Sequence, residues 1–420
     1  MRRYARDKRP HIKPVEKIQL SEDNTVRRAI AAVVLLIVGA AALAYAFSQL
    51  FSTESGWQTI EAGPSDGPTC AQEFTLLYEL GSKGQDTRAE ERALVQAYTE
   101  ACQTAYQLFH TMESFEGVTN LRDINAHPNE TLTVDRPLYA AFEAVQASGD
   151  RSVYLGPVWA RYSDLFFCQD DSQTADFDPW ISGAVAEGYA AIAAYAADPA
   201  HISVELLGED QICLRVSEEY LAYAAQEDID RFLDFGWMTN AFIADYLADT
   251  LAQAGFSHGV LSSFDGFARC LDGRDTAFAL DLYGWEQGRP IMAGTMQYQG
   301  PMSIVSLRAF PVTQEDWQRF YQQKDGQFRT PFLDPADGKC RQSVDSLVCW
   351  SGDAGCAQLA MAAAPVFIAG EFDPAPLERM AGEGMYALWC EGRVFSSTDR
   401  SLDIQNLYQI NGIVYSQTES

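Results

Sequence analysis

The sequence predicts an α+β domain that follows one N-terminal transmembrane helix. Residues 29–51 contain no charged side chain, and an uncharged apolar run of about 20 residues is long enough to span a bilayer as a helix. Residues 73–420 then mix segments whose apolar residues recur at helical spacing with short strand-like runs bounded by Gly, Asn and Asp.

The flanks of the uncharged run predict its orientation. Residues 1–28 hold nine Lys and Arg against four Asp and Glu, and Arg27 and Arg28 lie directly before the run. Because basic flanks stay in the cytoplasm, we predict a basic cytoplasmic tail, a membrane anchor at residues 29–51 and an extracytoplasmic main domain. A cleaved signal peptide is the alternative, since Ala44-Tyr45-Ala46 resembles a cleavage site, but the long leader favours the anchor.

Residues 52–72 are polar and contain Gly and Pro, which predicts a linker between the membrane and the domain at 73–420. The formal net charge of the chain is −28 although its N-terminal tail is basic. An acidic body excludes nucleic acid as a partner, because nucleic acids bind through neutralised phosphates. Anionic ligands would need a local cationic group or a metal ion.

The nine cysteines form no CxxC pair, which argues against a zinc site. Disulfides are allowed outside the cytoplasm, and an odd count leaves at least one thiol free or intermolecular. Cys349 and Cys390 each end an apolar strand-like run and are the candidate pair. The alternative is that most of the cysteines are small buried apolar residues.

Several elements follow from apolar spacing along the first half of the domain. Residues 74–80 read as a strand, and a helix is predicted over 88–114 with a Thr87–Glu90 capping box and Met112 on its apolar face. A helix capped by Asp135 follows. Next come an Ala-rich helix at 184–197 and a hairpin with strands at 204–207 and 211–216.

The most informative stretch is 233–273. Its central part has apolar residues at helical spacing that end at Ala254, with Asp245 and Asp249 outside the apolar face and Gly255 in the place of a left-handed cap. Strands are predicted at 259–261 and 267–271, with a turn over 262–266 between them. A loop, a helix and a Gly-containing turn can therefore meet at one ligand.

At these residues the chain resembles the ApbE-type FAD:protein FMN transferases. Their pattern LDLGGIAKGYAVD matches Leu233, Asp234, Gly236, Ala244 and Asp245 in register. The family Lys falls on Asn240, and the family Asn-Leu-Gly-Gly is replaced by residues 262–266.

A second match lies in the C-terminal third. Residues 325–335 align without gaps on the family DGKRYxHIIDP, and residues 313–321 precede them as the family Thr-Ser-Gly-Asp stretch does. The resemblance covers about residues 74–395 and predicts the flavin-transferase fold.

In the resembled family FAD lies in a cleft, and its pyrophosphate is attacked by a Ser or Thr hydroxyl of a target protein. Such phosphoryl transfer needs charge neutralisation. The positions of the family metal ligands and of its His hold Ala357, Met361 and Pro331 here. The resemblance therefore predicts FAD as the ligand, no Mg²⁺, and a degenerate flavin- or partner-binding homologue. A divergent active transferase and an envelope interaction module without flavin are the alternatives.

The resemblance also supplies the candidate site residues, and it supplies no metal ligands. Candidate catalytic residues are Asp334, Thr313 and Asp316. Candidate cofactor-binding residues are Gly236, Asn240, Asp245, Ser262, Ser263, Asp265 and Gly266. Each has a simpler interpretation: a turn around Asp334, an N-cap at Thr313, a solvated carboxylate at Asp245, and a hairpin turn over 262–266.

Overall fold

A computed structural model describes residues 55–82, 84 and 86–418, and these form one compact unit. The predicted tail at 1–28 and anchor at 29–51 lie outside the described residues. Among the described residues no helix is both long and apolar enough to span a membrane.

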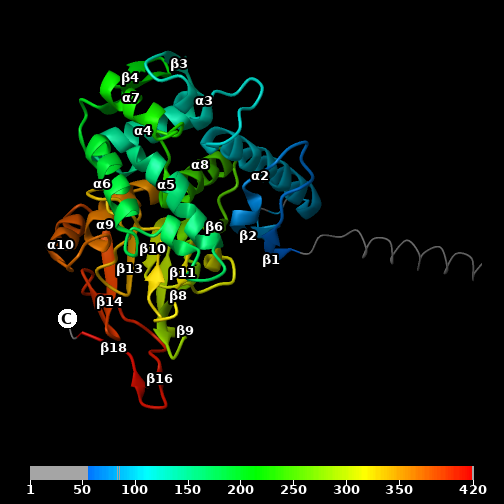
Figure 1. Ribbon diagram of the computed structural model, residues 1–420. Helices are drawn as coiled ribbons and strands as arrows, with labels where there is room; N and C mark the ends of the chain where they lie inside the picture. The colour runs from blue at the N-terminus through cyan, green and yellow to red at the C-terminus, as the bar shows by residue number, and fades with distance from the viewer. Residues whose placement is uncertain (1–54, 83, 85, 419–420) are drawn as a thin grey trace, which may run out of the picture. The chain divides into compact units, whose positions relative to one another are not determined.

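A nine-stranded sheet forms the centre of the domain (Figure 1), and its neighbouring strands are antiparallel except for the last pair. In spatial order the strands are β1 (Gly56–Ile60), β2 (Phe74–Leu80), β6 (Gly259–Ser263), β7 (Phe267–Cys270), β10 (Met302–Arg308), β13 (Ser346–Ser351), β14 (Tyr386–Glu391), β15 (Val394–Ser397) and β18 (Ser416–Gln417). Strand β1 lies within the predicted linker and pairs with β2.

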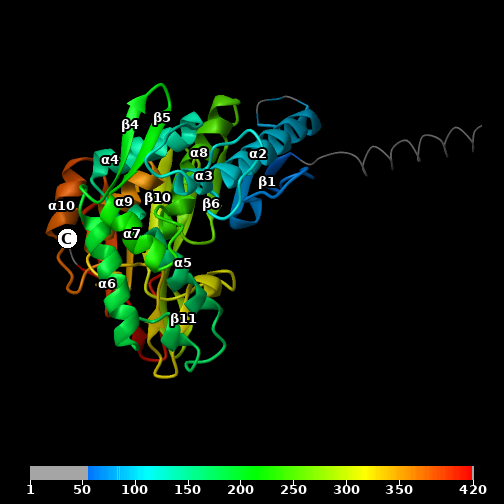
Figure 2. The same ribbon diagram turned by 45° about the horizontal axis from the view of Figure 1, so that its top comes forward.

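Helices cover one face of this sheet (Figures 1 and 2). The helices are α2 (Thr87–Phe109), α3 (Leu121–Ala126), α4 (Arg136–Ser148), α5 (Gly156–Tyr162), α6 (Gly183–Ala197), α7 (Glu218–Gln226), α8 (Thr239–Gln253), α9 (Cys356–Phe367) and α10 (Ala375–Gly382). Short 3-10 helices occur at Ala71–Glu73, Ser152–Leu155, Ser163–Phe167, Thr174–Asp176, Gly236–Met238 and Asp316–Arg319.

The remaining strands form small separate sheets. They are β3 (Thr131–Thr133), β5 (Gln211–Val216) and β4 (Ile202–Gly208) in one sheet, β8 (Ala277–Glu286) with β9 (Arg289–Gln299), β11 (Tyr321–Gln322) with β12 (Phe328–Arg329), and β16 (Gln409–Ile410) with β17 (Ile413–Val414). The predicted strand at 74–80, the Ala-rich helix and the hairpin at 204–216 are confirmed.

Two apolar cores lie on the opposite faces of the central sheet. The larger core contains Leu347 and Cys349 of β13 together with α2, α8 and α9. The smaller core contains Val348 of β13 and Cys390 of β14 together with the β8–β9 hairpin and the C-terminal segment. Because successive side chains of a strand point to opposite faces, these two cores use alternate residues of β13.

This alternation makes the predicted Cys349–Cys390 disulfide wrong. Cys349 opposes Ala387 in the register of β13 and β14, whereas Cys390 opposes Ser346. The two thiols therefore belong to different cores, and both are free and buried. Among the nine cysteines, Cys70 instead lies against Cys102, with its Sγ 3.3 Å from the Cys102 carbonyl oxygen.

The long helix α2 differs from its prediction at both ends. Asp86, and not Thr87, is the N-cap and accepts a hydrogen bond from the Arg88 amide. The Glu90 carboxylate accepts a hydrogen bond from the Gly81 amide at 2.7 Å. It therefore holds the loop before the helix and does not form a capping box. The helix ends at Phe109, and Met112, predicted on the apolar face, is 64 % exposed.

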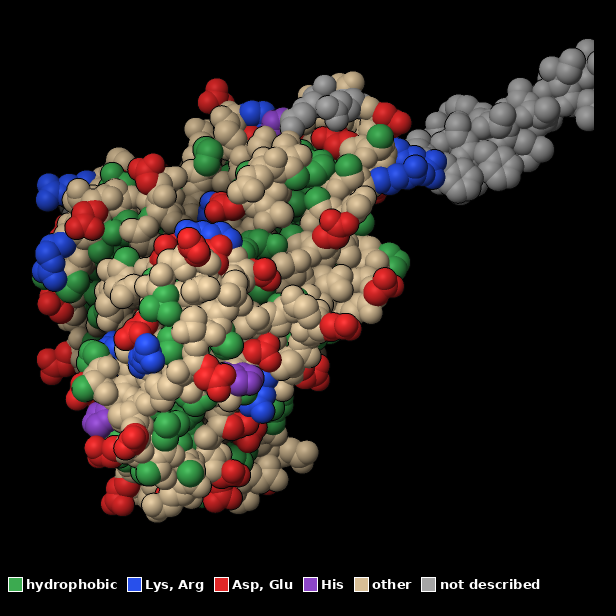
Figure 3. Space-filling model, turned by 90° about the horizontal axis from the view of Figure 1, so that it is seen from above, with side chains coloured by type: hydrophobic (Ala, Val, Ile, Leu, Met, Phe, Trp, Pro, Cys, Tyr) green, Lys and Arg blue, Asp and Glu red, His purple; other side chains and the backbone are tan. Residues whose placement is uncertain are grey.

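Helix α4 begins after Asp135 as predicted, but the Asp135 side chain makes no capping hydrogen bond. Acidic side chains are scattered over the face of the domain seen in Figure 3 and do not gather over one element.

Candidate functional site

The loop that leads into α8 is held by one buried asparagine. Asn125 accepts hydrogen bonds from the Phe232 and Leu233 amides at 3.0 and 2.8 Å, and its Nδ2 donates to the Leu233 carbonyl at 2.9 Å. Asp234 accepts from the Gly236 amide at 2.7 Å, and Gly236 has a φ of +56°, which favours glycine. These contacts fix where Trp237 lies.

Trp237 lines a pocket of about 430 Å³, which we call the Asp150 pocket. Its walls come from the turn at 148–152 after α4, the loop at 333–335 and the C-terminal half of α9. Most of the lining is apolar, including Leu333, Met361 and Ile368. A pocket of this size with an apolar lining and few polar groups is the common form of a small-molecule site.

Two buried polar atoms of this pocket have no hydrogen-bond partner within the described residues. Asp150 accepts from the Ser152 amide at 2.7 Å through Oδ1, but its Oδ2 is buried and has no hydrogen-bond partner within the described residues. The Ser152 hydroxyl is buried without a partner in the same part of the structure. Burial raises the pKa of the Asp150 carboxyl. An unpaired buried oxygen is costly, so the pocket is suited to a ligand that donates a hydrogen bond.

Among the described residues that line this pocket, the one cationic side chain, Arg151, binds elsewhere. Arg151 donates from Nε to the Ala196 carbonyl and from Nη2 to the Ile202 carbonyl, both at 2.7 Å. Its guanidinium therefore binds backbone carbonyls and not the Asp150 or Ser152 oxygens. Asp334 also lines the pocket, and Arg341 pairs with it at 2.5 Å. Arg341 in turn binds Asp337 at 2.7 Å, so its charge is shared between two carboxylates.

Asp150 should make the stability of the ligand-free protein depend on pH. Its folded pKa is raised above the ordinary value of 3.8, so the ionised carboxylate weakens folding once the pH rises through the folded pKa. Asp150→Asn should therefore raise the free energy of unfolding at pH 7, and this gain should vanish below about pH 3.8. Urea unfolding across this range measures it. The control is Asp281→Asn at an exposed side chain, which should leave the free energy of unfolding at pH 7 unchanged.

The positions of the family metal ligands hold no ligand side chains. Met361 lines the Asp150 pocket, and its sulfur accepts a hydrogen bond from the Ser148 hydroxyl at 3.1 Å. Ala357 is buried in the first turn of α9, and Pro331 is buried as well. Within the described residues, no three His, Cys, Asp or Glu side chains are grouped so that they can hold a metal ion.

Two predicted cofactor-binding residues, Asn240 and Asp265, lie together and are not among the residues that line that pocket. Asn240 donates to Glu73 at 2.8 Å and to Asp265 at 3.2 Å. Arg319 pairs with both carboxylates and lies over the Phe264 ring at 4.9 Å. Asp265 Oδ1 is buried and has no partner among the described residues. Sequence reasoning missed Glu73 and Arg319, although Arg319 lies within the matched stretch 313–321.

The Asp245 carboxylate is held by the protein and is not the solvated carboxylate that the simpler interpretation of the sequence predicts. Its side chain is 20 % exposed, pairs with Arg269 at 2.5 Å, and accepts from the Cys356 and Ala357 amides at 2.8 and 2.9 Å. It thus caps the first turn of α9 from the neighbouring helix α8. Asp249 lies outside the apolar face as predicted, and its side chain is 62 % exposed.

The other predicted residues lie in local turns. Asp316 is buried, and its Oδ2 accepts from Arg308 and from the Val312 and Thr313 amides, while the Thr313 hydroxyl accepts from the Asp316 amide. Ser262 and Ser263 end β6, and the Ser263 hydroxyl accepts from the Phe267 amide at 3.0 Å. Gly266 completes this turn with a φ of +105°.

Comparison with solved structures places this arrangement in a known fold. The ApbE protein of Thermotoga maritima aligns at a TM-score of 0.54 and 11 % identity over 84 % of this chain and 97 % of that one. The chain has the ApbE-type flavin-transferase fold. The flavin transferase ApbE of Vibrio cholerae aligns at a TM-score of 0.53 and 14 % identity over 86 % of this chain and 98 % of that one. No family model and no curated protein matches the sequence.

The ApbE-type fold predicted from the two matched stretches is confirmed by these structures. The alignments cover 97 % and 98 % of the two solved chains, so the fold extends over nearly all of each solved chain. At 11 % and 14 % identity it establishes the fold and leaves the chemistry to the side chains.

Proposed function

We propose that this ApbE-type domain binds a flavin-like ligand without transferring FMN. The observation that carries the proposal is the lining of the Asp150 pocket. Within the described residues, Met361 and an unpaired Asp150 oxygen line a space that contains no free cation. A pyrophosphate carries negative charge, which Asp150 repels and which no metal ligand or guanidinium neutralises there. A flavin ring offers an apolar plane and an imide N–H, which match Trp237 and Asp150.

We also propose that residues 29–51 anchor the chain in the cell membrane, with the domain on the extracytoplasmic side and a protein partner there. The uncharged run, its basic flank and the polar residues that follow it support this arrangement. The acidic body supports a role without nucleic acid.

The test incubates the purified full chain with FAD, with and without Mg²⁺, and then removes free ligand. We expect retained flavin absorbance and no released AMP. Asp150→Asn places an NH₂ group where an acceptor is needed, so flavin affinity should fall about tenfold or more. The Asp281→Asn variant should retain flavin as the wild type does.

The alternatives give different results in the same assay. AMP release in the presence of Mg²⁺ and a Ser- or Thr-containing target domain would identify a divergent transferase and end the non-catalytic proposal. Absence of bound flavin in the wild-type protein would favour the interaction module without flavin.

A further inference from the structure

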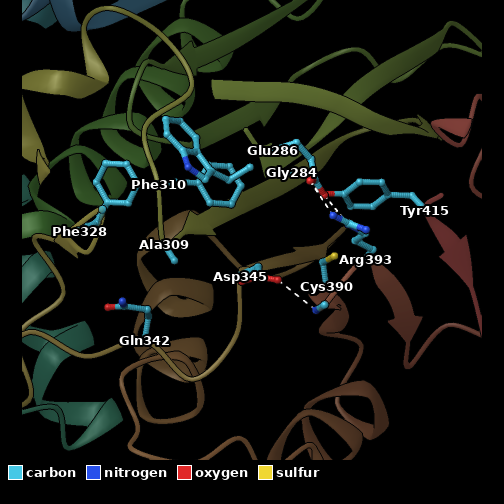
Figure 4. Close-up of a pocket in the computed structure, with 13 residues that line it drawn as sticks. Gly284, Glu286, Ala309, Phe310, Phe328, Gln342, Asp345, Cys390, Arg393 and Tyr415 are labelled. Atoms are coloured by element: carbon cyan, nitrogen blue, oxygen red, sulfur yellow. Dashed lines mark hydrogen bonds and ion pairs between the residues drawn. The ribbon is translucent and has the colours of Figure 1, made fainter. Parts of the chain in front are cut away.

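A second pocket, the Trp285 pocket, lies outside the Asp150 pocket and shares no lining residue with it. Its volume is about 530 Å³. It opens where β8, the segment after β10, β12 and the adjoining ends of β13 and β14 converge. Figure 4 shows Phe310 and Phe328 on one side, the Glu286–Arg393–Tyr415 group on the other, and Asp345 between them.

One wall of the Trp285 pocket is aromatic. The rings of Trp285 and Phe328 are 5.0 Å apart and nearly perpendicular, at 88°, and the ring of Phe310 lies 5.8 Å from Trp285. Phe310 is buried, whereas Trp285 and Phe328 are only partly buried and line the open space. Two rings at a right angle form a corner whose electron-rich faces attract positive charge.

The opposite wall contains a neutralised ion pair. Arg393 donates to Glu286 from Nε at 2.5 Å and from Nη2 at 2.7 Å, and the Tyr415 hydroxyl donates to the same carboxylate at 3.2 Å. Three donors occupy the Glu286 carboxylate, so it offers little to a ligand. Arg393 is the only cationic side chain among the described residues of this lining, and Glu286 balances its charge.

Asp345 provides the remaining negative charge of the pocket lining. It is exposed, its Oδ2 accepts from the Gly392 amide at 3.1 Å, and it forms no ion pair with any described residue. Burial and, second, the nearby charge of Asp345 raise the pKa of the Cys390 thiol to about 12. The lining of the pocket therefore combines one uncompensated negative charge with an aromatic corner.

We propose that the Trp285 pocket binds an organic ammonium cation, with the ammonium group at Asp345 and its carbon substituents against Trp285 and Phe328. Anionic ligands are excluded because Arg393 is neutralised and Asp345 repels them. A metal ion is excluded because Asp345 would be its single available carboxylate. The net charge of −28 further raises the local concentration of cations.

The test titrates the purified full chain with choline and with a primary alkylamine, followed by tryptophan fluorescence and calorimetry. We expect saturable binding of a cation, with about tenfold weaker binding of the neutral isostere of choline in which a tert-butyl group replaces trimethylammonium. Preference for choline would identify a quaternary ammonium ligand, and preference for the amine a protonated one.

Variants separate the charge from the aromatic wall. Asp345→Asn, at an exposed side chain, should weaken cation binding about tenfold without lowering the melting temperature, and Phe328→Leu should weaken it as well. Asp281→Asn removes a carboxylate from the same β8 strand that carries Trp285 and should leave binding unchanged. Equal binding of choline and its isostere, an unchanged Asp345→Asn affinity, or no saturable binding of either cation would overturn the proposal.

Discussion

Replacing Asp245 with alanine is expected to lower the free energy of unfolding by about 3 kcal/mol. The carboxylate caps the first turn of α9 through the Cys356 and Ala357 amides and pairs with Arg269. Alanine leaves both amides buried without an acceptor and removes the nearer partner of a guanidinium that is 19 % exposed. Urea unfolding of the purified protein, monitored by tryptophan fluorescence, measures the loss.

Asp249 provides a matched control because it pairs with the same Arg269, at 3.2 Å, from a side chain that is 62 % exposed. Asp249→Ala should change the free energy of unfolding by no more than about 0.5 kcal/mol. If the two variants lose equal stability, the cap on α9 is not the cause. If Asp245→Ala keeps its stability and loses only flavin, Asp245 is a ligand contact after all.

Local patterns predicted the elements that depend on local contacts. The strand at 74–80 and the helix at 184–197 follow from apolar spacing and flanking turn residues, and the structure has them at those positions or one residue away. The end of α2 was misplaced because its stop signal is not a glycine. His110 adopts an extended conformation, and its ring Nδ1 accepts from the Met112 and Glu113 amides, which turns the chain out of the helix.

The candidate site was less predictable because its contacts join distant segments. Asp245 receives amides 111 and 112 residues further along the chain, a relation that helical spacing does not reveal. The 148–152 segment reads as an ordinary loop, and local patterns do not show that 333–335 and α9 line one pocket with its buried Asp150 oxygen. The family resemblance predicted the fold and the substitutions at Ala357 and Met361, but not the groups that surround them.

Gly266→Ala should be as damaging as the loss of Asp245, at about 3 kcal/mol or more. Its φ of +105° is rarely adopted by residues with a side chain, and an added Cβ would come within 2.3 Å of the Ser306 carbonyl oxygen. That oxygen belongs to the backbone of β10, whose Ser306 amide also donates to the Gly266 carbonyl at 2.8 Å. A backbone clash in the middle of the sheet cannot be relieved by a change of rotamer.

Gly273→Ala is the matched control for this variant. Gly273 follows β7, its added Cβ would meet no atom within 4 Å, and its φ does not lie in the left-handed region. Its replacement should leave the free energy of unfolding unchanged or raise it by up to about 1 kcal/mol, because alanine restricts the unfolded chain. Thermal melting of both variants decides between two roles for Gly266. A Gly266→Ala protein that melts like the wild type yet retains no flavin would mean that this glycine is required by a ligand and not by the packing of its turn against β10.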